Sequence, residues 1–251
     1  MRSYKFATFN PHLHLTVRLG AEREVHEPTN TAWKRWRPSD PPPAQWYDLD
    51  RFERLVAAKI QHDRQLGRVR TVRELIAEFR GLTAMAKQKK LLAELGMART
   101  SLEALVVDGR LDRDQLDRLL KAMQAESRPV QATALGVIGK DHLLARLPLT
   151  DLGRESFTYR KRVDDAPGNP RIAETAFAFD EDALDSRLLL IGLNNSTALS
   201  EAGAFRELGV EGLGGLLGKQ YAGSDAPIAF VLHLTGARLS FTDRGKSAVA
   251  L

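Results

Sequence analysis

The sequence has no cysteine in its 251 residues, which excludes disulfides and thiolate metal sites and is compatible with a reducing compartment. It also lacks any apolar run approaching the roughly 20 residues that a helix needs to span a bilayer. The first ten residues, Met1 to Asn10, carry no apolar segment of the kind found in secretory signals. We therefore expect a cytoplasmic protein that makes no membrane contact.

Basic residues moderately outnumber acidic ones. The chain has 37 Lys and Arg against 32 Asp and Glu, which gives a net charge of +5, and 43% of its residues are hydrophobic. That apolar content can form the core of one large domain or two small ones. The basic excess is compatible with nucleic-acid binding, but many solvated surfaces carry the same excess.

The N-terminal region favours strands followed by an extended connector. Residues 5–27 are predicted as strand, because apolar residues alternate with polar ones from Leu13 to Leu19. The polar sequence from Gly20 to Arg23 predicts a hairpin turn. Residues 28–47 contain five prolines and three tryptophans, and they predict an extended connector, because proline lacks a backbone donor.

The next region predicts a compact array of short helices over residues 50–126. Asp50 with Glu53, Thr71 with Glu74, and Asp112 with Gln115 have the spacing of helix-start signals. Thr100 with Glu103 has the same spacing and predicts a short turn. A basic helix is expected from Ala84 to Leu95, ending at Gly96.

The second half predicts α+β structure. Ile172–Phe179 alternates like a strand, Leu188–Leu193 is a short apolar run, and Ile228–Leu234 is a stronger run typical of a central strand. Residues 159–169 are polar and are expected to form turns. Gly212–Gly218 lacks the lysine and hydroxyl spacing of a phosphate-binding loop, so we expect a flexible loop there.

Three local groups of residues suggest binding chemistry, each with a plainer interpretation. His12, His14 and His26 could bind a metal, but no carboxylate or thiol stands at ligand spacing, which favours ordinary strand histidines. The segment Trp33–Arg37 mixes cations with aromatics, as nucleic-acid-binding segments do. It could equally be a connector whose tryptophans attach it to a neighbouring domain.

A basic cluster lies on the expected helix from Ala84 to Leu95. Lys87, Lys89 and Lys90 could contact a DNA backbone, or they could form a solvated helix face. No arrangement of a nucleophile with a base, and no carboxylate pair, can be recognised in the sequence.

Several short motifs resemble, in order, those of the topoisomerase VI B subunit. Asn10-Pro11-His12 resembles the strand that closes the ATPase domain of that family, and Thr71–Gly96 resembles its helix-two-turn-helix insert. Arg128–Leu144 resembles the stretch leading into its transducer domain. Tyr159-Arg160 with Gly168-Asn169-Pro170 resembles the start of a transducer strand, and Val231–Leu234 with Phe241–Lys246 resembles a later strand and its loop.

The resemblance implies an α+β architecture in three parts. Residues 1–47 would be residual ATPase-domain strands with the connector, and residues 48–147 the small helical helix-two-turn-helix region. Residues 148–251 would be a C-terminally truncated, ribosomal S5 domain 2-like transducer, a β-sheet with helices. The GHKL-type ATP-binding core has no counterpart here, so we expect a truncated or split gene product, or an excerpt.

The resemblance also implies function. The chain would belong to an ATP-dependent type IIB DNA topoisomerase, working with a GHKL ATPase module, a topoisomerase VI A-like subunit and DNA, as a homodimer or heterotetramer in the complete enzyme. ATP and Mg²⁺ would bind only in that complex, and the chain alone would be inactive. Lys246 is the candidate for sensing the terminal phosphate, and Arg238 is the second choice.

DNA contacts are implied at a second loop. Lys219 and Tyr221 partly match a DNA-contacting motif of the family, with Gly218 in place of its tryptophan. Outside the topoisomerase interpretation, the chain could be a stand-alone DNA-binding or adaptor module without ATPase activity, or a structural relic that has lost both properties.

Overall fold

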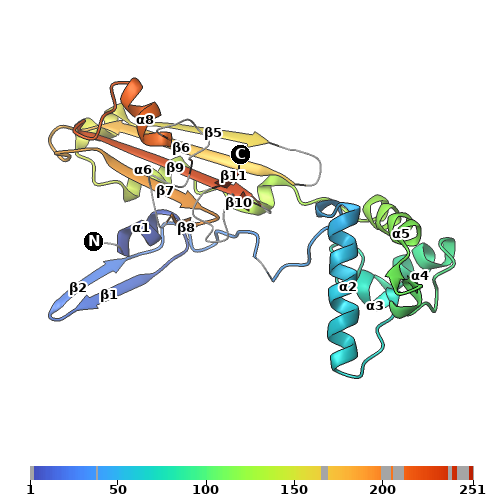
Figure 1. The fold of residues 1–251 in the computed structure, drawn as a ribbon. Helices are drawn as coiled ribbons and strands as arrows, with labels where there is room; N and C mark the ends of the chain where they lie inside the picture. The colour runs from blue at the N-terminus through green and yellow to red at the C-terminus, as the bar shows by residue number, and fades with distance from the viewer. Residues whose placement is uncertain are drawn as a thin grey trace. The chain divides into compact units, whose positions relative to one another are not determined.

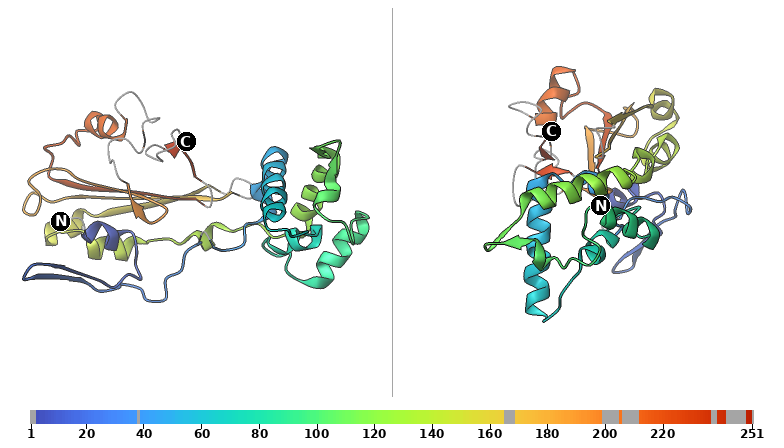
Figure 2. Two further views of the ribbon diagram at one scale, coloured as in Figure 1. Left: turned by 60° about the horizontal axis from the view of Figure 1, so that its bottom comes forward. Right: turned by 90° about the vertical axis from the view of Figure 1, so that its right-hand side faces the viewer.

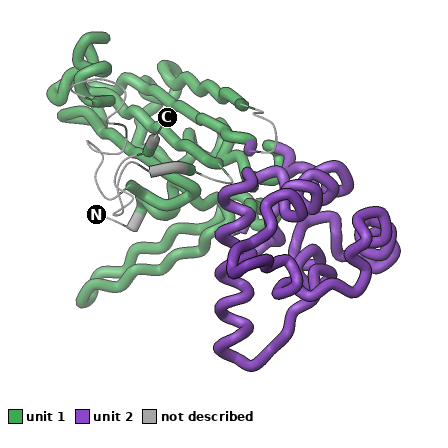
Figure 3. Tube along the Cα trace, turned by 45° about the vertical axis from the view of Figure 1, so that its right-hand side comes forward, with its two compact units in different colours: residues 1–36, 132–166, 170–251 green, residues 37–131, 167–169 purple. Residues whose placement is uncertain are grey.

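The chain forms two compact units, each with its own core. The computed structural model describes residues 3–37, 39–164, 169–198, 205, 212–236, 239–241 and 249–250. Unit 1 comprises residues 1–36, 132–166 and 170–251, and unit 2 comprises residues 37–131 with 167–169 (Figure 3). The predicted division placed residues 132–147 with the helical region. The structure groups them with the sheet instead, because the turn Ala132–Leu135 (η3) contacts strand β6 and helix α6 contacts α1.

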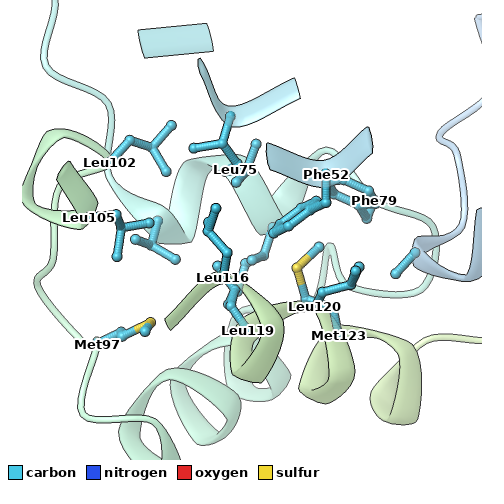
Figure 4. Close-up of a cluster of buried hydrophobic side chains, with 14 of the residues drawn as sticks. Phe52, Leu75, Phe79, Met97, Leu102, Leu105, Leu116, Leu119, Leu120 and Met123 are labelled. Carbon is cyan, nitrogen blue, oxygen red and sulfur yellow. The ribbon is translucent and has the colours of Figure 1, made fainter. Parts of the chain in front are cut away.

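Unit 2 is the predicted array of short helices. It contains η1 (Ala44–Trp46), α2 (Leu49–Gln65), α3 (Val72–Ala77), α4 (Met85–Glu94), η2 (Glu103–Leu105), the short hairpin β3 (Val106–Val107) and β4 (Arg110–Leu111), and α5 (Arg113–Glu126) (Figure 1). Apolar faces of these helices meet in a core where Phe52 and Phe79 lie edge to face with ring centroids 6.3 Å apart (Figure 4).

Side-chain caps fix where these helices begin. Thr71 and Glu74 form the predicted capping box at the start of α3. Asp112 accepts hydrogen bonds from the backbone N–H groups of Asp114 and Gln115 at the start of α5. The predicted box at Asp50 and Glu53 is wrong by two residues, because Asp48 is the N-cap of α2 and its Oδ1 accepts from Arg51 N at 2.8 Å.

Unit 1 is built on a five-stranded sheet in the order β5-β6-β9-β7-β8. The strands are β5 (Thr158–Asp164), β6 (Arg171–Phe179), β9 (Ile228–Gly236), β7 (Leu188–Leu193) and β8 (Ser196–Thr197), and only β7 and β9 run parallel. The prediction that Ile228–Leu234 is a central strand is confirmed. The expectation of turns from Tyr159 onward is wrong, because residues up to Asp164 pair with β6 as an edge strand.

Helices cover the sheet of unit 1 on both faces (Figure 2). One face packs against α1 (Ser3–Thr8), α6 (Lys140–Arg146) and the region of α7 (Asp151–Ser156). The other face packs against α8 (Gly212–Lys219), whose Leu213 and Leu217 join Ile191 of the sheet in one cluster. The expected flexible loop at Gly212–Gly218 is therefore wrong, since burial of these leucines stabilises a helix despite its glycines.

The N-terminal segment combines a helix with a hairpin. Residues 3–8 form α1 rather than the predicted strand, while β1 (Leu15–Leu19) and β2 (Glu22–His26) form the predicted hairpin. Gly20 in its turn has a φ of 61°, a value that glycine adopts readily. Near the C-terminus β10 (Ser240–Phe241) pairs with β11 (Val249–Ala250). In the described part of the chain, every helix is too short or too polar to cross a membrane.

Candidate functional site

Glu174 is the centre of a buried polar network in unit 1. Its side chain is fully buried on the β6 face that also carries Ile172 and Ala176. One carboxylate oxygen accepts from Tyr159 Oη at 2.7 Å and from Gly139 N at 2.8 Å. The other accepts from Ile138 N at 3.0 Å and lies 3.2 Å from His233 Nδ1. A buried carboxylate with this many donors is fully satisfied.

The electrostatics of Glu174 follow from these partners. Burial on its own would raise the pKa of the carboxyl, but the hydrogen bonds from His233, Gly139 and Ile138 outweigh burial and lower it. Tyr159 shows the opposite effect, since burial and the hydrogen bond to Glu174 raise the pKa of its phenol. The network therefore holds Glu174 as a carboxylate and Tyr159 as a neutral donor.

His233 connects the carboxylate to the loop after β7. The backbone N–H of Asn195 donates to Nε2 of His233 at 3.2 Å, so that nitrogen is an acceptor and Nδ1 carries the proton facing Glu174. The ring of Phe9 stacks on the imidazole with centroids 5.6 Å apart. Gly192 makes this approach possible, because a Cβ there would lie 2.5 Å from the ring of Phe9. His233 is fully buried as a result.

Two asparagines connect the N-terminal segment to the same network by hydrogen bonds. Asn10 Nδ2 donates to the carbonyl of Asn195 at 2.8 Å, and Asn195 Nδ2 donates to the carbonyl of Phe9 at 3.3 Å. Asn195 has a φ of 64°, a conformation that asparagine tolerates better than most residues. The network thus joins segments that are up to 186 residues apart in the sequence.

A Glu–His pair can serve as an acid–base unit in enzymes, but this pair is sealed from solvent. Both side chains have an exposure of 0%, and each polar atom of the pair already has a protein partner. A substrate cannot reach either group without opening the core. The arrangement instead fixes β6, β9, the β7–β8 turn and residues 9–10 in one rigid geometry.

His142, on α6, forms a second buried contact with the N-terminal segment. Its Nε2 donates to the carbonyls of Ala7 and Thr8 at 3.1 and 3.0 Å, and its Nδ1 accepts from the hydroxyl of Thr29. Burial lowers the pKa of His142 to about 4. The imidazole is therefore neutral near pH 7, and it attaches α1 and the start of the connector to α6.

In the Trp33–Arg37 segment, Trp33 and Arg35 contact other residues of unit 1. Trp33 Nε1 donates to the carbonyl of Val137 at 2.6 Å, and its ring stacks on His12 with centroids 5.1 Å apart. Arg35 donates to the carbonyl of Asn194 at 3.0 Å. These contacts agree with the interpretation of the segment as an attached connector, since Trp33 is already engaged by protein groups.

The three N-terminal histidines do not converge on a metal site. His14 lies 2.9 Å from Glu27, His26 lies 3.0 Å from Glu24, and His12 stacks on Trp33. Within the described ranges no group of three His, Asp or Glu side chains is placed to hold a metal ion.

The basic cluster on α4 is partly neutralised by acidic neighbours. Lys87 donates to the carbonyl of Glu126 and lies 3.8 Å from its carboxylate. Lys90 lies 3.9 Å from Glu126 and 4.0 Å from Glu94. Lys89 is exposed on the same helix. The predicted DNA contact by these three lysines stays a prediction, with part of its charge already compensated.

Lys219 and Tyr221 are two residues apart in the sequence, and both are exposed on unit 1. Lys219 ends α8 and is exposed, and Tyr221 follows two residues later with 98% of its surface accessible. The φ of Tyr221 is 59°, a left-handed conformation that non-glycine residues seldom adopt. An exposed aromatic ring can stack on a nucleobase, and an exposed lysine can contact a phosphate.

The predicted phosphate-sensing residues, Lys246 and Arg238, lie outside the described residues. Arg238 comes between β9 and β10, and Lys246 between β10 and β11. Their role stays a prediction. Sequence reasoning did not single out Glu174, Asn195 or His142. Glu174 left a signal, because it is a charged residue in phase with Ile172 and Ala176 on the apolar side of an alternating strand.

Comparison with known proteins gives limited similarity. No protein-family profile matches the chain, and no curated protein matches it. Among solved structures, the chain is similar to the B subunit of DNA gyrase from Myxococcus xanthus, with 19% sequence identity and a TM-score of 0.25. The similarity covers 37% of this chain, which spans 28% of the length of that gyrase subunit.

Proposed function

We propose that this chain is part of the B subunit of an ATP-dependent type IIB DNA topoisomerase, in which it couples ATP binding and hydrolysis to DNA strand passage. The observation that carries the proposal is the composition of the buried network. Asn10, Gly139, Tyr159 and His233 each belong to a different motif that resembles the topoisomerase VI B subunit, and all four take part in that network. Motifs that meet in one core are better explained by a common fold than by four separate coincidences.

In this proposal the rigid sheet transmits movement between two ends of unit 1. The Glu174–His233 pair joins β9, which precedes the segment bearing Arg238 and Lys246, to the N-terminal segment through Asn195 and Asn10. A displacement at one end then moves the other as a rigid body. ATP would be held by a separate GHKL module, where Lys246 or Arg238 would add positive charge beside the terminal phosphate. Within the described residues no three His, Asp or Glu side chains are grouped to hold a metal ion.

The test begins with purification of the tagged chain from its native host. We expect a GHKL ATPase module and a topoisomerase VI A-like subunit to co-purify, and the complex to relax supercoiled DNA only with ATP and Mg²⁺. In that complex Lys246→Ala should slow ATP turnover at least tenfold, while the exposed Lys161→Ala should leave it unchanged. Absence of both partners, or relaxation that ignores ATP, would contradict the proposal.

A stand-alone DNA-binding module is a second candidate function, favoured by Tyr221 and Lys219. Tyr221 is almost fully exposed, the exposed Lys219 precedes it by two residues, and the whole chain carries a net charge of +5. Such a module should bind single-stranded DNA without nucleotide and release it as salt rises. Tyr221→Ala should weaken binding by about tenfold, measured by fluorescence anisotropy. DNA binding that persists unchanged in 0.5 M salt, or in Tyr221→Ala, would exclude this function.

A further inference from the structure

Unit 2 contains a cavity of about 860 Å³ between α2 and the β3–β4 hairpin. Its floor is apolar, with Ala57 and Ile60 from the helix and Val106 and Leu111 from the hairpin. Four arginines surround this floor. Arg54 and Arg64 come from α2, Arg110 from the hairpin, and Arg113 from the first residue of α5. We call this feature the arginine groove.

Two of the four arginines are already paired. Arg113 Nη2 lies 2.6 Å from Asp50, and its Nη1 also contacts Glu53. Arg64 Nε lies 2.7 Å from Glu103. These pairs compensate part of the charge of the two guanidinium groups.

Arg54 and Arg110 are in a different position. Arg54 donates from Nε to the backbone carbonyl of Asp50 at 3.2 Å, and Arg110 is exposed on the hairpin. Neither is a partner in the ion pairs of the described residues, although the charge of Arg54 acts on Asp50 and helps to lower the pKa of that carboxyl. The groove therefore presents two guanidinium groups outside the described ion pairs, one on each of the two elements that form it, with apolar surface between them.

The hairpin keeps this surface open. Asp108 and Gly109 in its turn have φ values of 50° and 76°, as a two-residue turn of this kind requires. Val107 next to the turn is 51% exposed. The hairpin thus extends beside α2 and forms a wall of the groove without filling it.

We propose that the arginine groove binds a short acidic segment of a partner protein, with a large apolar side chain on the floor and carboxylates at Arg54 and Arg110. Its volume falls within the range of sites that take a few side chains. A duplex phosphate backbone would leave the apolar floor of the groove unused. This inference is independent of the proposed topoisomerase role, because it concerns a different unit and a different ligand.

The test is a selection of random dodecapeptides displayed on phage against the full-length chain. We expect the enriched peptides to carry one or more large apolar residues flanked by Asp or Glu. A synthetic fluorescein-labelled copy of an enriched peptide should bind with micromolar affinity. The exposed pair Arg54→Glu and Arg110→Glu together should weaken it by about tenfold or more. Arg118→Glu, an exposed arginine outside the groove, should change the affinity by less than about twofold.

A second variant tests the apolar floor without changing charge. Ala57→Trp should block the groove and abolish peptide binding, with the helical circular dichroism of the chain retained because Ala57 is exposed. The proposal is overturned if no peptide is enriched, or if both groove variants bind the peptide as well as the unchanged chain. It is also overturned if a 20-base-pair duplex binds and loses affinity in the double charge reversal while no peptide does.

Discussion

Glu174 is bonded by side chains of strands β5 and β9 and by two backbone N–H groups. A substitution at this one residue therefore tests the whole buried network. In Glu174→Gln an amide nitrogen replaces one carboxylate oxygen and faces a donor, either Tyr159 or His233. We expect the free energy of unfolding to fall by about 3 kcal/mol, because a buried donor loses its acceptor. Urea denaturation measures this change.

The matched control is Glu181→Gln on the surface of unit 1. It should alter the free energy of unfolding by no more than about 0.5 kcal/mol. If Glu174→Gln were as mild as this control, the carboxylate would not hold the segments together, and the rigid-sheet role in the proposed function would lose its basis.

His142 makes the stability of unit 1 depend on pH. Its pKa is about 4 in the folded chain, against 6.5 for a histidine exposed to water, so the unfolded chain binds more protons between these values. The contribution of the neutral imidazole is fully present above pH 6.5, and it is lost as the pH falls toward 4. The difference of about 2.5 units corresponds to roughly 3 kcal/mol.

His142→Gln separates this effect from that of the carboxylates. Glutamine can still donate to the carbonyls of Ala7 and Thr8, but it does not titrate. The unchanged chain should lose about 3 kcal/mol more than this variant when urea denaturation at pH 7 is compared with pH 4. Acidic groups with lowered pKa, such as Glu174 and Asp180, affect both chains equally. Identical pH profiles would show that His142 is not buried as described.

At the scale of elements, the capping box at the start of α3 gives a sharp prediction. Thr71→Ala removes the acceptor of Glu74 N, and the free energy of unfolding should fall by about 1 kcal/mol. The backbone N–H of Thr71 is the main cause that lowers the pKa of Glu74 to about 2, and Thr71→Ala retains this group. Glu74 therefore stays ionised at both pH 7 and pH 4, and the loss should be the same at the two pH values. Thr83→Ala, at an exposed position before α4, is the control and should be neutral. An equal effect of both changes would contradict the cap.

The helix starts show which parts of the fold can be predicted from the sequence. The signals at Thr71 and Asp112 were read correctly because a cap depends on residues within one helical turn. The start of α2 was misplaced because Asp48 and Asp50 can both serve as caps, and packing of the helix selects between them. The residue pattern alone missed strand β5, because an edge strand with a polar outer side has no apolar alternation to recognise. The resemblance did mark Tyr159-Arg160 as the start of a strand.

Helix α8 was missed for a related reason. Its glycines argue against a helix on local preference, but Leu213 and Leu217 are buried against the sheet. This stabilisation comes from strands that are distant in the sequence. The Glu174 site also depends on contacts between residues that are distant in the sequence. Asn10 and Asn195 are 185 residues apart, and no local pattern indicates that they meet.

At the scale of the whole molecule, the two units differ in how many segments of the chain form them. Unit 1 is assembled from both ends of the chain, whereas unit 2 is nearly one continuous segment. The sequence predicted the helical array, because its signals are local. It did not predict that residues 1–36 share a unit with the second half, because those contacts are held by the long-range bonds of Asn10 and His142.

The continuous segment gives the last prediction. Residues 37–131 enclose a core of 18 buried hydrophobic residues drawn entirely from that segment. A fragment of this size with its own core should fold alone. We expect the isolated fragment to show helical circular dichroism, dispersed amide resonances and one cooperative urea transition, which Thr71→Ala shifts to lower urea. The fragment also contains the whole arginine groove, so it should bind the selected acidic peptide as tightly as the full chain does. Broad resonances with no cooperative transition would mean that unit 2 depends on unit 1 for its structure, and the two units would then have to be treated as one folding domain.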